Sequence, residues 1–299
     1  MSKIILILRW LSLVGVIFVF IFLYQTGESD VFREFSVSNF LLAIFCLLIV
    51  FVIRAWIWWL FLLRFQIKIS FKKATNLLFK PVLSKYIPGK VWFLMSSAAT
   101  IHGAGISFGH SGFLLIVWQL MLISSGLFVG VFGLFFYHFI GASFKIQSIL
   151  LLMTIATTVL LIKNKRIPQF VAKFSRKFLK TDLSQYEIPP MIDLFMLLAA
   201  NWMMMGGAFV ICFQAVSLNA GFLPIFFQPL ANNIGVMAFF VPAGLGAREG
   251  VMMGYLSLLG ITKVQAGVAV IMARLWFTLV DVLLFLSAVF IFKETDTAS

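Results

Sequence analysis

Two short polar segments interrupt the most apolar parts of this chain: KYIPGK at residues 85–90 and PAGLGARE at residues 242–249. Each combines proline and glycine, which end or bend helices, with charged side chains. In a lipid bilayer, a broken helix survives only where protein or a wet cavity satisfies its free backbone groups. Charged side chains at that depth are costly and by default indicate a functional site. The pair therefore predicts discontinuous helices at the working centre of a membrane transporter.

The rest of the composition is that of a membrane protein. Of the 299 residues, 62% are hydrophobic and 11% are charged, and the mean hydropathy is +1.09. Several apolar runs exceed the roughly 18 residues that indicate a spanning helix. The runs are continuous rather than alternating, which disfavours a transmembrane barrel. The sequence predicts an all-α polytopic membrane protein that forms one integral-membrane domain over residues 1–299.

Charge is unevenly distributed along the chain, whose net charge is +13. Between Glu34 and Asp182 there is no acidic residue, yet sixteen lysines and arginines occur there. Positive-inside bias and attraction to anionic lipid would explain these residues without further function. Handling of an anionic lipid substrate is the alternative. Nucleic acid is the least favoured partner, because the basic residues stand in short loops between spans.

Six apolar runs predict full transmembrane helices. They cover residues 4–24, 38–63, 110–137, 146–162, 191–216 and 264–292. The first run is longer than a signal-peptide core and lacks an obvious small-residue cleavage site, so we expect it to be retained. The positive-inside rule places the N-terminus and the basic loops at residues 64–73 and 163–190 in the cytoplasm.

This orientation constrains residues 74–101, which must enter and leave the membrane on the cytoplasmic side, because two clear spans separate them from the next cytoplasmic loop. The segment is too short to cross twice, since one crossing takes about 20 residues. We therefore predict a re-entrant helical hairpin with its tip at Pro88 and Gly89.

The second half repeats this order upside down. Its first span leads outward, residues 222–260 dip in from outside with a tip near Pro242 to Gly246, and its last span returns the C-terminus to the cytoplasm. Residues 222–260 nearly suffice for two tilted crossings, so a double crossing is the alternative. Span, hairpin and span in halves at about 38–137 and 191–292 form a predicted inverted repeat.

The first tip has the chemistry of an anion site. Pro88 suits the first turn of a helix, and the helix after it would aim its free N–H groups and positive dipole end at the tip. Lys85 and Lys90 add two cations, and Tyr86 and Trp92 could line a sugar or acyl path. A proline kink with lysines that reach toward the interface is an equally favoured interpretation.

At the second tip, Gly244 and Gly246 allow positive φ and close backbone approach. In the first turn of the helix that follows, Glu249 suits the helix dipole and Arg248 does not. Adjacent helical residues point apart, so these two are not expected to neutralise each other. Arg248 therefore needs an external anion: a distant acid, a lipid phosphate or a substrate. Pairing with Asp281 or with a lipid headgroup is the alternative.

Other polar residues in the apolar runs are candidates for the same site. Arg274 and Asp281 lie on roughly one face of the last span, about two turns apart. Asp281 could pair with Arg248, Lys85 or Lys90, either as an ion pair that orients helices or in a proton relay. Asn232 and Asn233 are candidates for a substrate hydroxyl contact, although interhelical hydrogen bonds are the default.

The tryptophans beside Arg54 and the lack of enzyme motifs lead to two further predictions. Arg54 is followed closely by tryptophans at 56, 58 and 59, which favours an interfacial anchor. The chain contains no Walker A loop, no HExxH and no GxSxG pattern. We therefore predict no catalytic residue, no metal site and no cofactor.

Several of these segments together resemble the transmembrane domain of lysylphosphatidylglycerol synthases. They are RAWIWWL at 54–60 with Arg64, SFKKA at 70–74, YIPGKVW at 86–92 and FVPAGLGAREG at 240–250. The last is similar to that family's Pro-x-Gly-Leu-Gly-x-Arg-Glu-Gly segment, and the resemblance extends from about 38 to 292. It assigns the family's motif positions to Pro88, Gly89, Pro242, Gly244, Gly246, Arg248 and Glu249.

The resemblance implies a lipid flippase. In bifunctional members this domain is joined to a cytoplasmic aminoacyl-transferring domain, and this chain ends at Ser299 without one, so the resemblance implies flipping without synthesis. Stand-alone members are similar to proteins tied to polyprenyl- or dolichyl-phosphate sugars in cell-envelope glycan assembly. A lipid-linked glycan and an aminoacyl phospholipid are thus both implied substrates.

We therefore expect a transporter that moves an anionic lipid across the inner membrane, with an envelope glycosyltransferase or an aminoacyl-lipid synthase as partner. One alternative is an integral-membrane transferase acting on a lipid phosphate, for which Glu249 or Asp281 would be the base. Another is a scaffold for a membrane glycosyltransferase, which would depend on the surface of the 163–190 loop.

Overall fold

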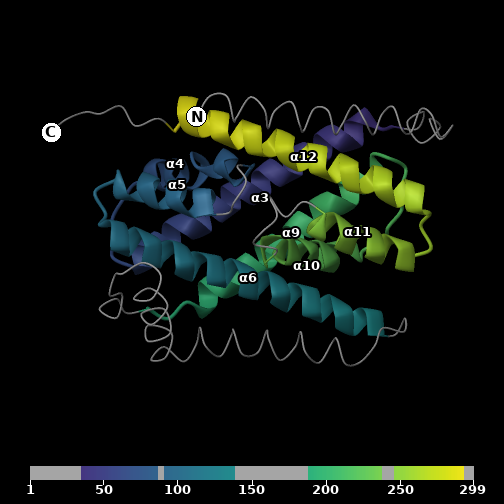
Figure 1. Ribbon diagram of the computed structural model, residues 1–299, viewed down its shortest axis with the longest axis horizontal. Coiled ribbons are helices and arrows are strands. Elements are labelled where there is room, and N and C mark those ends of the chain that lie inside the picture. Colours follow the sequence, from purple (N-terminus) through teal and green to yellow (C-terminus); the bar gives the residue numbers. More distant parts are fainter. Residues whose placement is uncertain (1–34, 87–90, 139–187, 238–245, 293–299) are drawn as a thin grey trace.

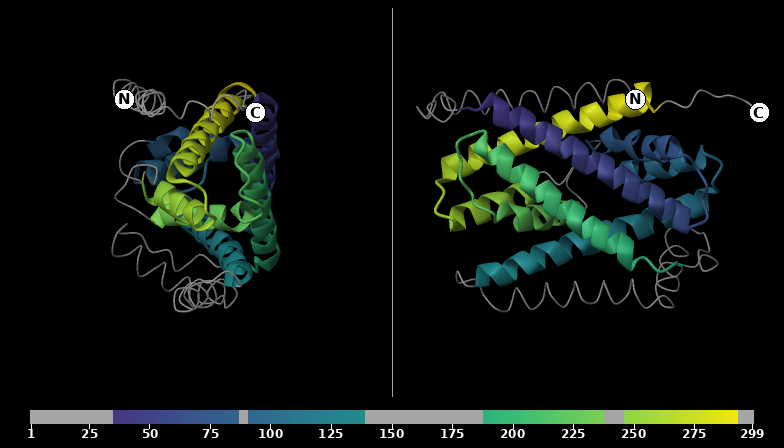
Figure 2. Two further views of the ribbon diagram at one scale, coloured as in Figure 1. Left: turned by 90° about the vertical axis from the view of Figure 1, so that its right-hand side faces the viewer. Right: turned by 180° about the vertical axis from the view of Figure 1, so that it is seen from behind.

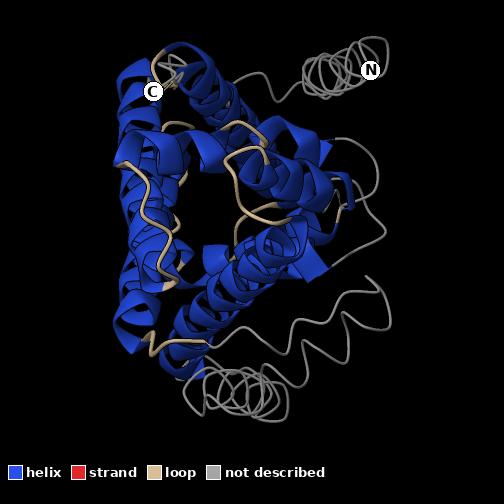
Figure 3. Ribbon diagram, turned by 90° about the vertical axis from the view of Figure 1, so that its left-hand side faces the viewer, coloured by secondary structure: helices blue, strands red, loops and turns tan. Residues whose placement is uncertain are grey.

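The computed structural model describes residues 35–86, 91–138, 188–237 and 246–292. All elements in these segments are helices, joined by loops and turns (Figure 3). The predicted spans at 4–24 and 146–162 lie outside the described residues, as does nearly all of the 163–190 loop. So do five predicted tip residues: Pro88, Gly89, Lys90, Pro242 and Gly244.

The helices follow the same order of lengths in both halves of the chain (Figure 1). The first half contains α3 (Val37–Arg64), α4 (Phe71–Phe79), η1 (Val82–Tyr86), α5 (Val91–His102) and α6 (Phe108–His138). The second half contains α9 (Ile192–Gln214), α10 (Pro224–Met237), α11 (Ala247–Leu258) and α12 (Lys263–Phe290). A long helix, a pair of short limbs and a second long helix thus occur twice.

Four of these helices are long and apolar enough to cross a membrane: α3, α6, α9 and α12. They correspond to the predicted spans at 38–63, 110–137, 191–216 and 264–292, so the all-α polytopic architecture is confirmed. The α-helices between them have only 9 to 14 residues. At 1.5 Å per residue they are about 14 to 21 Å long, less than the roughly 30 Å of a hydrocarbon core.

The short helices begin and end at residues that favour helix termini. α4 starts at Phe71, three residues before the predicted start of the hairpin at residue 74. The Ser70 side chain accepts a hydrogen bond from the Lys73 N–H and thereby caps the helix. Pro81 follows the end of α4, since proline offers no N–H to continue it, and η1 comes next. α10 begins at Pro224, a position where the missing N–H needs no partner.

The two halves are arranged in opposite directions. α3 and α9 pack against each other and run antiparallel (Figure 2, right). α6 and α12 also run in opposite directions, and the α4–α5 pair lies at the opposite end of the molecule from the α10–α11 pair (Figure 1). This is the arrangement that an inverted repeat produces.

Glycines let the second pair of short limbs approach the long helices closely. A Cβ at Gly206 of α9 would lie 2.3 Å from the Ile225 Cα of α10. On α6, a Cβ at Gly126 would lie 2.2 Å from the Asn233 Nδ2. Helices in membranes pack through such small residues, because van der Waals contact replaces the hydrophobic drive that lipid does not supply.

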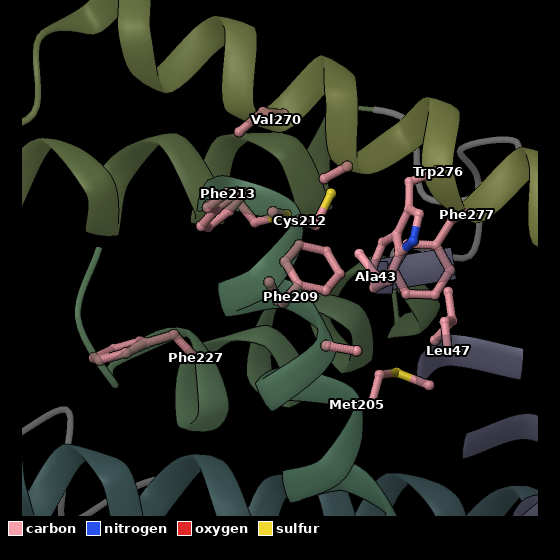
Figure 4. Close-up of a cluster of buried hydrophobic side chains, with 14 of the residues drawn as sticks. Ala43, Leu47, Met205, Phe209, Cys212, Phe213, Phe227, Val270, Trp276 and Phe277 are labelled. Carbon is pink, nitrogen blue, oxygen red and sulfur yellow. The ribbon is translucent and has the colours of Figure 1, made fainter. Parts of the chain in front are cut away.

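An aromatic cluster joins α9 to α12 in the interior (Figure 4). The Phe209 ring centroid lies 5.1 Å from that of Trp276 and 5.4 Å from that of Phe277. Leu47 of α3 is buried in the same cluster. This packing fixes Phe277, whose ring supports one of the cations described below.

The structure corrects the expectation that Arg54 is an interfacial anchor. Arg54 is buried between α3 and α9, where its Nε donates to the Asn201 Oδ1 at 2.9 Å. Its guanidinium carbon lies 4.6 Å from the Trp202 ring centroid and 5.4 Å from that of Phe51. Of the neighbouring tryptophans, Trp58 is buried, so this face of α3 points into the bundle rather than toward a membrane surface.

This contact makes an asymmetric prediction for stability. Asn201→Leu should lower the free energy of unfolding by about 2 kcal/mol, because it removes a hydrogen bond from a buried charge. Arg54→Met should cost less, since it removes the charge together with its need for a partner. Thermal unfolding of both purified variants in detergent measures the difference. A larger loss for Arg54→Met would contradict this account of the contact.

Candidate functional site

One face of α12 collects the polar ends of both pairs of short helices. From the first pair, the Lys85 Nζ forms an ion pair with the Asp281 Oδ2 at 2.7 Å, and the Tyr86 hydroxyl donates to the same oxygen at 2.6 Å. From the second pair, Glu249 forms an ion pair with Arg274 of α12. The guanidinium donates a hydrogen bond to the Glu249 Oε1 at 2.5 Å. Segments that enter from opposite ends of the molecule therefore meet on one helix.

Glu249 is held through both carboxylate oxygens. Its Oε1 binds Arg274, and its Oε2 accepts a hydrogen bond from the backbone N–H of Gly246 at 2.7 Å. Gly246 has a φ of 80°, in the left-handed region that favours glycine, and it precedes the first turn of α11. A carboxylate in that turn also complements the helix dipole. Glu249 thus fixes the start of α11 against α12.

Arg248 has no such partner. Its guanidinium carbon lies 4.2 Å from the Phe277 ring centroid and 5.8 Å from that of Phe209. With the residues that the structure describes, Arg248 makes no hydrogen bond and no ion pair, although Glu249 and Asp281 are near enough to act on it electrostatically. A guanidinium stacked on a ring keeps its N–H edges for an in-plane anion such as phosphate.

The charges of this cluster do not balance. Lys85, Arg248 and Arg274 face two carboxylates, Glu249 and Asp281, which leaves an excess of one positive charge among the described residues. The side chains of Lys85 and Arg274 are 34% and 33% exposed, whereas that of Asp281 is 1% exposed. The cluster is therefore accessible through its cations and suits an anionic ligand.

The structure brings together most of the predicted charged residues. Lys85, Tyr86, Gly246, Arg248, Glu249, Arg274 and Asp281 all lie in or beside the cluster on α12. Of the three cations that the sequence left open for Asp281, Lys85 pairs with it, and Lys90 lies outside the described residues. Arg248 is not paired with Asp281; it lies on the Phe277 ring instead.

Of the remaining predicted residues, three lie elsewhere in the described part of the chain, and Pro88, Gly89, Lys90, Pro242 and Gly244 lie outside it. Asn233 is buried, and its Nδ2 donates to the Ile123 carbonyl of α6 at 3.4 Å. Asn232 is partly buried on the same helix, α10. Trp92 is 54% exposed on α5. For Asn233, the contact is the interhelical hydrogen bond that membrane bundles commonly use.

Sequence reasoning missed two contributors to the site. Phe277 carries the Arg248 guanidinium, and the Thr278 hydroxyl lies 3.3 Å from that of Tyr86. The signal was present in the spacing, because Arg274, Phe277, Thr278 and Asp281 follow the i, i+3, i+4, i+7 pattern of one helix face. In the described part of the chain, no group of three or more His, Cys, Asp or Glu side chains is placed to hold a metal ion.

Comparison with protein-family models supplies the identification. Residues 6–284 match the family described as the lysylphosphatidylglycerol synthase TM region. The chain belongs to this family. The comparisons with curated proteins and with solved structures found no match.

The family match covers the whole candidate site. It includes both pairs of short helices and the part of α12 that contacts them. As a member of the lysylphosphatidylglycerol synthase TM family with four long apolar helices in its described part, the protein is a multi-pass membrane protein. The family associates it with the modification or transport of lipid.

Proposed function

We propose that this protein is a flippase that moves an anionic lipid across the inner membrane, with both termini in the cytoplasm, and that it performs no chemistry on the lipid. The observation that carries the proposal is the meeting of the two pairs of short helices on α12, where the described residues have an excess of positive charge and Arg248 has no hydrogen bond or ion pair with any of them. A lipid headgroup with a phosphate supplies the anion that this arrangement accommodates.

The headgroup would bind through phosphate rather than through sugar or amino acid. Arg248 offers N–H groups along one plane, which match two phosphate oxygens at once. Lys85 lies within the same cluster and adds a point charge through a side chain that is partly exposed. Lys90, which follows the first tip, remains a predicted third cation.

The inverted arrangement supports transport over simple binding. The α4–α5 and α10–α11 pairs come from opposite ends of the molecule, and Lys85 of η1, between α4 and α5, and Glu249 of α11 both make ion pairs with α12. A site held from both ends can be opened toward one side while the other side stays closed, as in transporters built from inverted repeats. The chain has no Walker A pattern, so we propose an ion or lipid gradient as the driving force.

The test is lipid flipping by the purified protein in proteoliposomes. We expect labelled polyprenyl-phosphate sugar or aminoacyl phospholipid to change leaflet faster than in protein-free vesicles. Offering both lipids separately identifies the substrate class. Recovery of the lipid afterwards, unchanged in mass, is part of the expected result.

The same assay examines the alternatives. A covalent change in the lipid would indicate a transferase instead. Glu249 is poorly suited as its general base, since both of its oxygens are already engaged. If no lipid moves, and a membrane glycosyltransferase requires this protein even when its charge cluster is neutralised, the protein is a scaffold and the flippase proposal is wrong.

A further inference from the structure

The two carboxylates of the cluster differ in how they are held. Glu249 uses both oxygens, one toward Arg274 and one toward the Gly246 N–H. Asp281 uses only Oδ2, which receives both Lys85 and the Tyr86 hydroxyl. Its Oδ1 is buried and has no hydrogen-bond partner. Two acids in one site with unequal environments are suited to different roles.

Asp281 depends on Lys85 for its charge. It is fully buried on α12, and an ionised carboxylate in such a place is stable only while it is paired. Among the described residues, Lys85 is the cation within ion-pair distance of it, and this lysine belongs to η1, at the entrance to the first predicted tip. When Lys85 moves away, the Asp281 carboxylate keeps one neutral donor, the Tyr86 hydroxyl, and its Oδ1 still has no hydrogen-bond partner.

The other charges around Asp281 are committed or face elsewhere. From α11, Arg248 lies on Phe277 and Glu249 pairs with Arg274 of α12 itself. Among the described charged residues of the other helices packed against α12, Arg54 and Arg64 of α3 contact Asn201 and Asp193 of α9, Lys72 of α4 is exposed, and Lys73 of α4 is half-buried. Among the described residues, Lys85 is therefore the only cation that forms an ion pair with Asp281.

We propose that Asp281 is the proton-coupling site of this transporter, and that a phosphodiester anion and a proton enter the cluster together. The inference rests on the proposed function. The phosphate takes the Lys85 ammonium, which stays protonated, and the released Asp281 carboxylate accepts one proton from water. One negative and one positive charge are added, so the net charge of the occupied cluster is unchanged.

Tyr86 allows this exchange without losing a hydrogen bond. Its hydroxyl donates to the ionised Asp281. A hydroxyl can also accept, so it can receive a hydrogen bond from the protonated acid. Thr278, whose hydroxyl lies 3.3 Å from that of Tyr86, offers the Tyr86 proton an alternative acceptor. The charge of Asp281 can therefore be cancelled while its surroundings stay bonded.

The test measures proton uptake when a phosphodiester binds. The probe is dihexanoyl-phosphatidylglycerol, a short-chain lipid whose single negative charge does not titrate near neutral pH. It is added to the purified protein in weakly buffered detergent that contains a pH dye. We expect about one proton to be taken up per bound probe, and the affinity to fall by up to about tenfold per pH unit above neutrality.

Matched variants assign the proton. Asp281→Asn should bind the probe with no proton uptake and with an affinity that hardly changes with pH. Glu249→Gln should keep the proton uptake wherever it still binds, because its carboxylate is not released. Binding to wild-type protein without proton uptake, or uptake that survives in Asp281→Asn, overturns the coupling inference and leaves the phosphate site standing. Failure of the wild-type protein to bind the probe overturns the phosphate site and the inference with it.

Discussion

Replacing Arg248 with glutamine should slow lipid flipping in proteoliposomes at least tenfold. The Arg248 guanidinium lies on Phe277 and has no hydrogen bond or ion pair with the described residues, so we expect it to bind the lipid phosphate. A charge-assisted hydrogen bond contributes about 1.5–3 kcal/mol, and each 1.4 kcal/mol corresponds to roughly a factor of ten. Arg248→Lys should recover only part of the rate, since it restores the charge but not the planar pair of donors.

A surface cation is the control for this result. Lys263 is exposed at the start of α12, so Lys263→Gln removes the same charge without touching the cluster. Size-exclusion chromatography in detergent shows whether each variant is folded. Equal flipping by folded Arg248→Gln and Lys263→Gln would remove Arg248 from the site.

Adding one methyl group at Gly206 should destabilise the protein by about 1–3 kcal/mol, which is the usual cost of overpacking. A Cβ there would lie 2.3 Å from the Ile225 Cα and 2.5 Å from its carbonyl oxygen. These are backbone atoms of α10, which cannot move aside as a flexible side chain can. Gly206→Ala should therefore separate α10 from α9 and lower the unfolding temperature in detergent.

The neighbouring glycine provides a control of opposite sign. A Cβ at Gly207 would meet nothing within 4 Å. Alanine favours a helix over glycine by up to about 1 kcal/mol, so Gly207→Ala should leave stability unchanged or raise it. Similar unfolding temperatures for the two variants would show that α9 and α10 do not pack as described.

Much of this fold was predictable, because the bilayer restricts the choices. Apolar length alone located α3, α6, α9 and α12, and helix breakers located the short pairs between them. The limits of those short helices were less predictable. α4 begins at its Ser70 cap rather than at residue 74, a local hydrogen bond that hydropathy does not report.

The charged residues of the described cluster were predictable from the sequence, but their pairings were not. The rarity of charge in apolar runs pointed to Lys85, Arg248, Glu249 and Asp281. Which cation meets which acid depends on how the two halves cross α12, and the sequence does not contain that geometry. Arg54 was misjudged for the same reason: neighbouring tryptophans suggested a membrane surface, whereas its partner Asn201 lies on a helix 147 residues away.

If the protein transports lipid as proposed, the two separate ion pairs that Lys85 and Glu249 make with α12 would limit ion leakage. Releasing Lys85 alone, or Glu249 alone, leaves one pair of opposite charges separated, and the cost is greatest for Asp281, which is fully buried. Breaking both ion pairs at once separates two pairs of opposite charges and costs roughly twice as much free energy. When no lipid is bound, nothing compensates for breaking the first ion pair. The state with both ion pairs broken, through which ions could cross the membrane, would therefore be the least populated.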